Sequence, residues 1–201
     1  AGVGGETEVD AGFLLLHENF ADVTQVPFVA PDIAPSVLGA APPPLDVVVS
    51  ETSVSLHRDF PPAPLPAWQA EIVGSPLDTP YRTEQSGFFP SPAVWVDHWD
   101  AQAEDGTWVR LRFTHLVTPI DASSSRLLWA VSRDFALGNR AVDQYLDGIF
   151  TDYYDRVIDA MEIAQEVLEI DGPGPEVNVN ADAVGLKIRE IVSALLTAEG
   201  A

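Results

Sequence analysis

The chain has 201 residues, of which 31 are acidic and 10 basic, giving a formal net charge of −21. This length suits one large domain, and a hydrophobic content of 46% is enough for a buried core. The acidity excludes the basic surface that binds nucleic acid or anionic membranes, and the absence of cysteine excludes disulfides and a self-contained iron–sulfur cluster. No stretch resembles a membrane span or a signal peptide, so we expect a cytoplasmic protein.

The first predicted elements follow a glycine-rich start. Residues 1–12 are expected to be a flexible N-terminus, and residues 13–201 a single domain. The segment 13–27 predicts a short helix or turn that Pro27 ends. The proline- and alanine-rich segment 31–44 predicts an irregular loop.

The hydrophobic period then changes to two, which predicts strands. The candidate segments are 46–56, 93–99, 107–118 and 126–135. In the third, the even-numbered residues from Trp108 to Thr114 share one face, and Val109, Leu111 and Phe113 share the other. The dipeptide Asp105-Gly106 before it is a hairpin turn signal.

Two helices follow the strands. Apolar residues at helical spacing predict a long amphipathic helix over 140–170, and the glycine–proline stretch 171–175 ends it. A last helix is predicted over 181–198. Strands first and long helices last indicate an α+β fold, a curved antiparallel sheet around a long C-terminal helix.

General catalytic motifs are missing from the sequence. There is no nucleophile elbow, no phosphate loop and no pair of histidines at metal-ligand spacing. Carboxylates gather on the side of the long helix opposite its apolar stripe, which is typical of a solvated face; they are Asp152, Asp155, Asp159, Glu162 and Glu166.

Five segments nevertheless resemble one family, in the same order. The segment 14–30, LLLHENFADVTQVPFVA, resembles the iron-site helix of Rieske non-haem iron oxygenases of the vanillate O-demethylase type. THLVTP from Thr114 and LWAVSRDF from Leu128 are similar to its late strands, and YDRVIDA from Tyr154 to its iron-ligand helix. DAVGLKIR from Asp182 is similar to the end of that domain. The resemblance implies the START-like helix-grip fold of the oxygenase catalytic domain.

The departures from that family concern its iron. Aligned by this resemblance, the two histidine ligands fall on Gln25 and Ala30, and the carboxylate ligand on Asp155; Asn19 and Asp22 also match. An amide and a methyl group do not replace two imidazoles on iron(II), so we expect a vestigial site without metal or other cofactor. The sequence also lacks the Cys-x-His pairs of a Rieske cluster.

Asp155 has two interpretations, as a relic facing the old iron cavity or as part of the solvated face, and the retained motif around it favours the first. His17 is close enough to Asn19 in sequence to be a substitute ligand, although its direction on a helix argues against that role. His98 and His115 lie on predicted strands, where a histidine is typically a hydrogen-bonded core or pocket-wall residue.

A helix-grip cavity without iron predicts a ligand pocket. Phe28, Trp95, Trp108 and Trp129 are its candidate ligand-binding residues, the alternative being plain core packing. Arg110 and Arg112 form a closely spaced basic pair that either receives an anionic ligand or pairs with the many carboxylates.

The functional hypothesis is a non-catalytic relative of an oxygenase catalytic domain, which binds a small hydrophobic or aromatic molecule or partners an oxygenase subunit. The alternative is a mononuclear non-haem iron monooxygenase or demethylase component that receives electrons from a separate Rieske protein and uses iron(II). We expect a monomer or dimer.

Overall fold

The computed structural model describes residues 1–172, 174–175 and 177–200. Its strands are β1 (Gly2–Val9), β2 (Asp46–Val49), β3 (Val54–Asp59), β4 (Ala63–Pro64), β5 (Pro80–Ser91), β6 (Val94–Gln102), β7 (Trp108–Pro119) and β8 (Ser125–Arg133). Its helices are α1 (Phe13–Ala21), α2 (Val26–Val29), α3 (Ala67–Val73), α4 (Arg140–Asp171) and α5 (Ala183–Glu199), with short 3₁₀ turns η1 (Val23–Gln25), η2 (Ser36–Gly39) and η3 (Asn180–Asp182).

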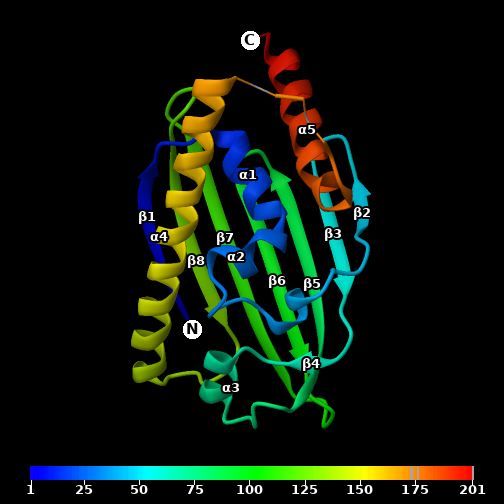
Figure 1. Ribbon diagram of the computed structural model, residues 1–201, viewed down its shortest axis with the longest axis vertical. Coiled ribbons are helices and arrows are strands. Elements are labelled where there is room, and N and C mark those ends of the chain that lie inside the picture. Colours follow the sequence, from blue (N-terminus) through cyan, green and yellow to red (C-terminus); the bar gives the residue numbers. More distant parts are fainter. Residues whose placement is uncertain (173, 176, 201) are drawn as a thin grey trace.

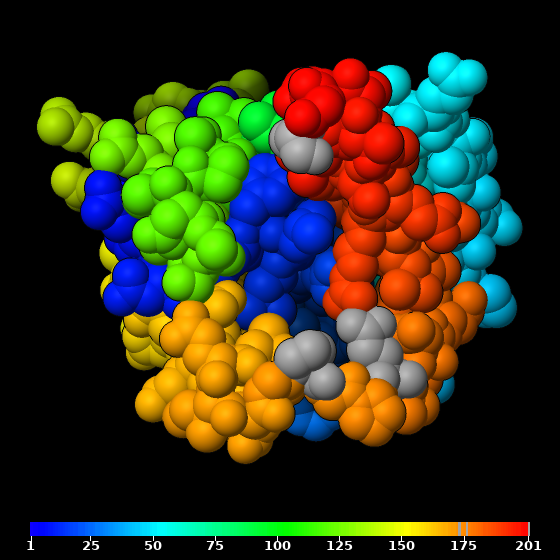
Figure 2. Space-filling model, turned by 90° about the horizontal axis from the view of Figure 1, so that it is seen from above, coloured from blue at the N-terminus to red at the C-terminus, as the bar shows by residue number. Residues whose placement is uncertain are grey.

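One curved antiparallel sheet organises these elements. Its strands are ordered β1-β8-β7-β6-β5-β3-β2, and β4 pairs with β5 beside this path. Helices α4, α1 and α5 cover the same face, α4 against β1, α1 against β7 and α5 against β3 (Figure 1). Seen from the end where α4 finishes, α1 forms the floor of a depression between α4 and α5 (Figure 2). The predicted α+β architecture is confirmed.

The long helix α4 forms where the sequence predicts it. Its N-terminus is capped by Asn139, whose Oδ1 accepts hydrogen bonds from the N–H groups of Ala141 and Val142 at 3.1 and 3.3 Å. Leu146, Phe150, Tyr154 and Val157 recur at helical spacing and are all buried. The helix ends at Asp171 and is followed by Gly172, with a φ of 70°; Pro173, part of the predicted break, lies outside the described residues.

The side-chain alternation predicted for 107–118 is also confirmed. Val109 and Leu111 are 3% and 4% exposed and point into the core, while Arg110 and Arg112 lie on the outer face. Gly106, with a φ of 87°, makes the turn before β7, and the N–H of Thr107 donates to Asp105 at 2.8 Å.

The expectation of a flexible N-terminus is corrected by the structure. Residues Gly2–Val9 form edge strand β1, paired with β8 from Gly2 opposite Ser132 to Val9 opposite Ser125. The glycines make this close approach possible, because a Cβ on Gly5 would lie 2.9 Å from the indole ring of Trp129. The composition that suggested a frayed end is therefore what allows the strand to lie over a tryptophan.

Two other segments differ from the sequence prediction. The segment 46–56 is divided into β2 and β3 by a turn in which Ser50 Oγ accepts from the N–H of Ser53 at 3.0 Å. Strand β5 was not predicted, because its proline, glycine and charged residues obscure the alternation, yet it pairs with both β3 and β6. Among the described residues, no helix is long and apolar enough to cross a membrane.

Candidate functional site

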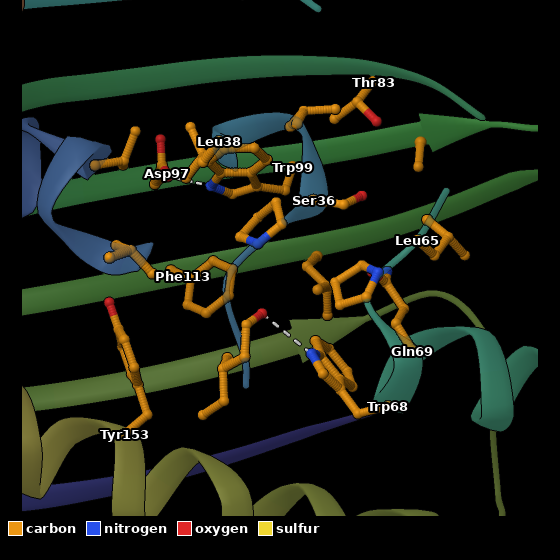
Figure 3. A pocket seen from close by; sticks show the side chains of 18 of the residues that line it. Ser36, Leu38, Leu65, Trp68, Gln69, Thr83, Asp97, Trp99, Phe113 and Tyr153 are labelled. Atoms are coloured by element: carbon orange, nitrogen blue, oxygen red, sulfur yellow. Dashed lines mark hydrogen bonds between the residues drawn. The ribbon is translucent and has the colours of Figure 1, made fainter. Parts of the chain in front are cut away.

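A cavity of about 90 Å³ lies between the inner face of the sheet and the segments that cover it (Figure 3). This volume has room for several water molecules or a small organic ligand. Strands β5, β6 and β7 form one wall, η1, η2 and α3 form another, and α4 contributes Phe150 and Tyr153. Aromatic and aliphatic side chains dominate the lining: Phe20, Val26, Ile33, Leu38, Leu65, Trp68, Trp99, Leu111, Phe113 and Phe150.

Asp97 is the carboxylate in this lining. Strand β6 turns it inward, where it is only 4% exposed. Its Oδ1 accepts from Gln85 Nε2 at 3.2 Å and its Oδ2 from Trp99 Nε1 at 2.5 Å. Burial raises the pKa of Asp97 to about 7, although these two hydrogen bonds and the charges of Arg58 and Arg112 oppose the rise. The group therefore exchanges its proton near neutral pH.

Two amides and a hydroxyl add further polar groups. Asn19 and Gln25 line the cavity, and their side-chain oxygens are buried without a hydrogen-bond partner among the described residues. Tyr153 extends from α4 toward the sheet, with its hydroxyl end facing the side of the cavity that holds Asp97 (Figure 3). Burial and then the charge of Asp97 raise the pKa of Tyr153, which places the two groups within electrostatic reach.

His115 of β7 also lines the cavity. Its ring stacks on Phe20 at a centroid distance of 3.9 Å, and its Nε2 lies 2.8 Å from the hydroxyl of Tyr154. Burial lowers the pKa of His115 to about 3, so the imidazole is neutral at physiological pH. This agrees with the pocket-wall role that the sequence favours for a strand histidine.

The four aromatic residues proposed from the sequence as ligand-binding lie elsewhere. Phe28 is 87% exposed on α2, and Trp95 is fully buried against Gly87. Trp108 lies on the outer face under the guanidinium of Arg110, 4.6 Å from it. Trp129 stacks on Tyr154 at 4.2 Å.

None of these four is among the residues that line the cavity. The cavity instead uses Trp99 and Phe113, whose inward direction follows from strand alternation, and Trp68, which lies in a helix the sequence analysis missed. The alternation of side chains along β6 and β7 could have identified Trp99 and Phe113 from the sequence. The prolines around Trp68 obscured the helix in which it lies.

The residues aligned with the family's iron ligands do not form a metal site. Gln25 lines the cavity, and Ala30 is fully buried with only a methyl group to offer. Asp22 caps η1 by accepting from the N–H of Thr24 at 2.8 Å. Asp155 is exposed, which corrects the interpretation that it faces the old iron cavity; Tyr154 turns inward at that level of α4.

These positions therefore do not fit iron. Within the described residues, no group of three or more histidine, cysteine, aspartate or glutamate side chains could hold a metal ion. Iron(II) in a facial triad needs two imidazoles and a carboxylate converging on one point, and this chain presents an amide, a methyl group and an outward carboxylate there.

The basic pair on β7 is engaged on the outer face of the sheet. Arg112 forms a bidentate ion pair with Asp100. Arg110 bonds Asp134 at 3.0 Å. Of the two interpretations that the sequence left open, pairing with carboxylates is the one observed, and neither arginine lines the cavity.

Fold and sequence place the chain in one family. It belongs to the vanillate O-demethylase oxygenase C-terminal domains, which match residues 9–198. These are the catalytic domains of Rieske-type oxygenases, so the resemblance seen in the five sequence segments is confirmed. No curated protein matches the sequence.

Solved structures agree on the fold. Dicamba monooxygenase bound to 3,6-dichlorosalicylic acid superimposes with a TM-score of 0.81 and 19% identity, over 100% of this chain and 60% of that one. The dicamba complex gives 0.82 and 16%, over 99% and 59%. NdmA of Pseudomonas putida CBB5 with caffeine gives 0.65 and 18%, over 94% and 50%. This confirms the helix-grip fold, and the chain spans between half and three fifths of the length of these proteins.

Proposed function

We propose that this domain binds a small planar aromatic molecule in the cavity under α1 and does not itself carry out iron-dependent oxygen chemistry. The observation that carries the proposal is the combination of an aromatic-walled cavity with Gln25 and Ala30 at the family's histidine positions. An amide and a methyl group supply no ligand set for iron(II), whereas loss of the metal leaves the apolar walls able to bind.

The nature of the ligand is supported by the relatives. The compared structures of dicamba monooxygenase contain dicamba or 3,6-dichlorosalicylic acid, and that of NdmA contains caffeine. All three are small planar ring compounds. In this chain the rings of Trp68, Trp99 and Phe113 provide flat apolar surfaces on several sides of the cavity, which suit the same shape.

The test combines metal analysis with ligand binding. Protein purified from iron-supplemented medium should hold well under one iron per chain and consume no oxygen with a reductant and an aromatic substrate. Neutral aromatics such as toluene should raise the melting temperature. Ala101→Leu, which adds volume inside the cavity lining, should reduce that rise, and Ala130→Leu on the exposed face of β8 should not.

Stoichiometric iron that resists chelation, or turnover, would overturn the proposal and establish the alternative of an iron monooxygenase component. Absence of any stabilising ligand at millimolar concentration would overturn it as well, leaving a role as partner of an oxygenase subunit.

A further inference from the structure

The charge in the lining of the cavity is negative and is not balanced by a lining cation. Asp97 is the only aspartate or glutamate among the described lining residues, and no lysine or arginine lies among them. The two nearest cations do not neutralise it by contact. Arg112 is bound to Asp100 on the opposite face of the sheet, and Arg58, 4% exposed, has no carboxylate within ion-pair distance in the described chain.

Other oxygen atoms in the cavity lining can accept hydrogen bonds from N–H donors of a ligand. The side-chain oxygens of Asn19 and Gln25 are buried without a hydrogen-bond partner among the described residues, and each can accept from a ligand. Each oxygen of Asp97 already accepts one hydrogen bond and keeps further acceptor capacity. The NH2 groups of Asn19 and Gln25 could donate to a carboxylate ligand. The charge of Asp97 nevertheless repels such a ligand, in surroundings where water does not screen the repulsion.

We infer that the cavity selects a small planar nitrogen base, one that presents N–H donors or a positive charge to Asp97 while its ring lies between Trp99, Phe113 and Trp68. Anionic aromatic acids are rejected by the same carboxylate. This inference rests on the proposed function, because it specifies the ligand of the same cavity.

The geometry in Figure 3 is consistent with this orientation. Asp97 and Trp99 lie on one side of the cavity, while Tyr153 and Trp68 approach from the other. A ring between them would have its polar edge at Asp97 and its faces against aromatic side chains. Charge attraction inside an apolar enclosure favours the cation over a neutral ligand of equal shape.

The test uses probes of similar shape and different charge. Benzamidine is a planar cation with N–H donors, benzoate is its near-isosteric anion, and toluene is the uncharged apolar reference. Calorimetry at about pH 8 should show benzamidine binding about tenfold or more tighter than benzoate, a difference of about 1.4 kcal/mol or more. Asp97→Asn should remove most of this preference while toluene binding persists. Asp100→Asn, on the same strand with its side chain on the outer face, should retain the preference.

A pH titration of the unmodified protein provides a second measurement if Asp97→Asn does not fold. Benzamidine affinity should rise between pH 6 and 8 as Asp97 loses its proton, whereas toluene affinity should stay constant. The other groups facing Asp97 do not change charge in this range. The pKa of His115 is lowered to about 3 and that of Tyr153 is raised, and the guanidinium groups of Arg58 and Arg112 remain protonated.

The outcomes separate this inference from the proposed function. Toluene binding together with benzoate equal to or tighter than benzamidine would overturn the nitrogen-base inference alone. A preference that survives Asp97→Asn, or a benzamidine affinity that does not change with pH, would do the same. Failure of all three probes would overturn the proposed function itself.

Discussion

His17 of α1 is fully buried, with its ring edge-on to Phe13 and Phe89 at centroid distances of 4.6 and 5.1 Å. Burial lowers its pKa from 6.5 to about 4. The folded state therefore binds fewer protons than the unfolded state between these values. The stability contributed by neutral His17 is fully present above about pH 6.5 and is lost as the pH falls toward 4.

A substitution at this residue should reduce the acid sensitivity of the protein. Since one pKa unit corresponds to about 1.4 kcal/mol, His17 accounts for about 3 kcal/mol of the stability lost on acidification. Urea unfolding at pH 7 and pH 4.5 should show a smaller loss for His17→Leu than for the unmodified protein. Asp97 acts with the opposite sign, but it is common to both proteins and cancels in the comparison.

The control is His57→Gln, because the His57 side chain is 43% exposed. Compared with this variant at an exposed site, His17→Leu should lose less stability on acidification. An equal loss in His17→Leu would show that His17 is not enclosed as described.

At the scale of elements, strand β5 depends on one residue without a side chain. Gly87 lies between Leu56 of β3 and Trp95 of β6, and a Cβ there would lie 2.5 Å from the indole Cζ2 of Trp95. Trp95 is fully buried and cannot move aside easily. Gly87→Ala should therefore destabilise the protein by about 1–3 kcal/mol through overpacking, as measured by chemical unfolding.

Gly148 provides the matched control for the same substitution. It lies exposed within α4, and a Cβ there would meet no atom within 4 Å. Gly148→Ala should stabilise the protein by about 0.5–1 kcal/mol, because alanine favours the helix and glycine does not. Opposite signs for the two substitutions support the described packing of β5, and a Gly87→Ala variant as stable as the unmodified protein would contradict it.

The secondary-structure elements differ in how well the sequence alone predicts them. Helix α4 and strand β7 were predicted because their periodicity is uninterrupted, and each needs only local residues to be recognised. Strand β5 was not predicted because Pro80, Gly87 and Pro90 interrupt its pattern, although it is an interior strand of the sheet. Its neighbours β3 and β6, rather than its composition, hold it in place.

For the molecule as a whole, the net charge of −21 governs association and salt response. Like-charge repulsion opposes self-association at low salt. Light scattering at low protein concentration should therefore give the mass of a monomer or dimer. Added sodium chloride should raise the melting temperature, because it screens the repulsion between carboxylates within the folded chain.

A mass near three chains in dilute low-salt buffer would contradict this prediction and favour the hypothesis of an oxygenase partner. A melting temperature that does not change with salt would contradict the expected repulsion between the carboxylates of the folded chain.

The sequence by itself determined the family, the α+β order of elements and the absence of histidine at Gln25 and Ala30. These properties depend on residue identity and local periodicity, which are readable along the chain. Only the tertiary structure decided that 1–12 contains an edge strand, that Asp155 points to solvent, and that Trp99 rather than Trp95 lines the cavity. The reason is that exposure and cavity contacts depend on which segments meet in space. The environment of Asp97 is set by Gln85, Trp99 and the helix that carries Tyr153, and no pattern within β6 specifies those contacts.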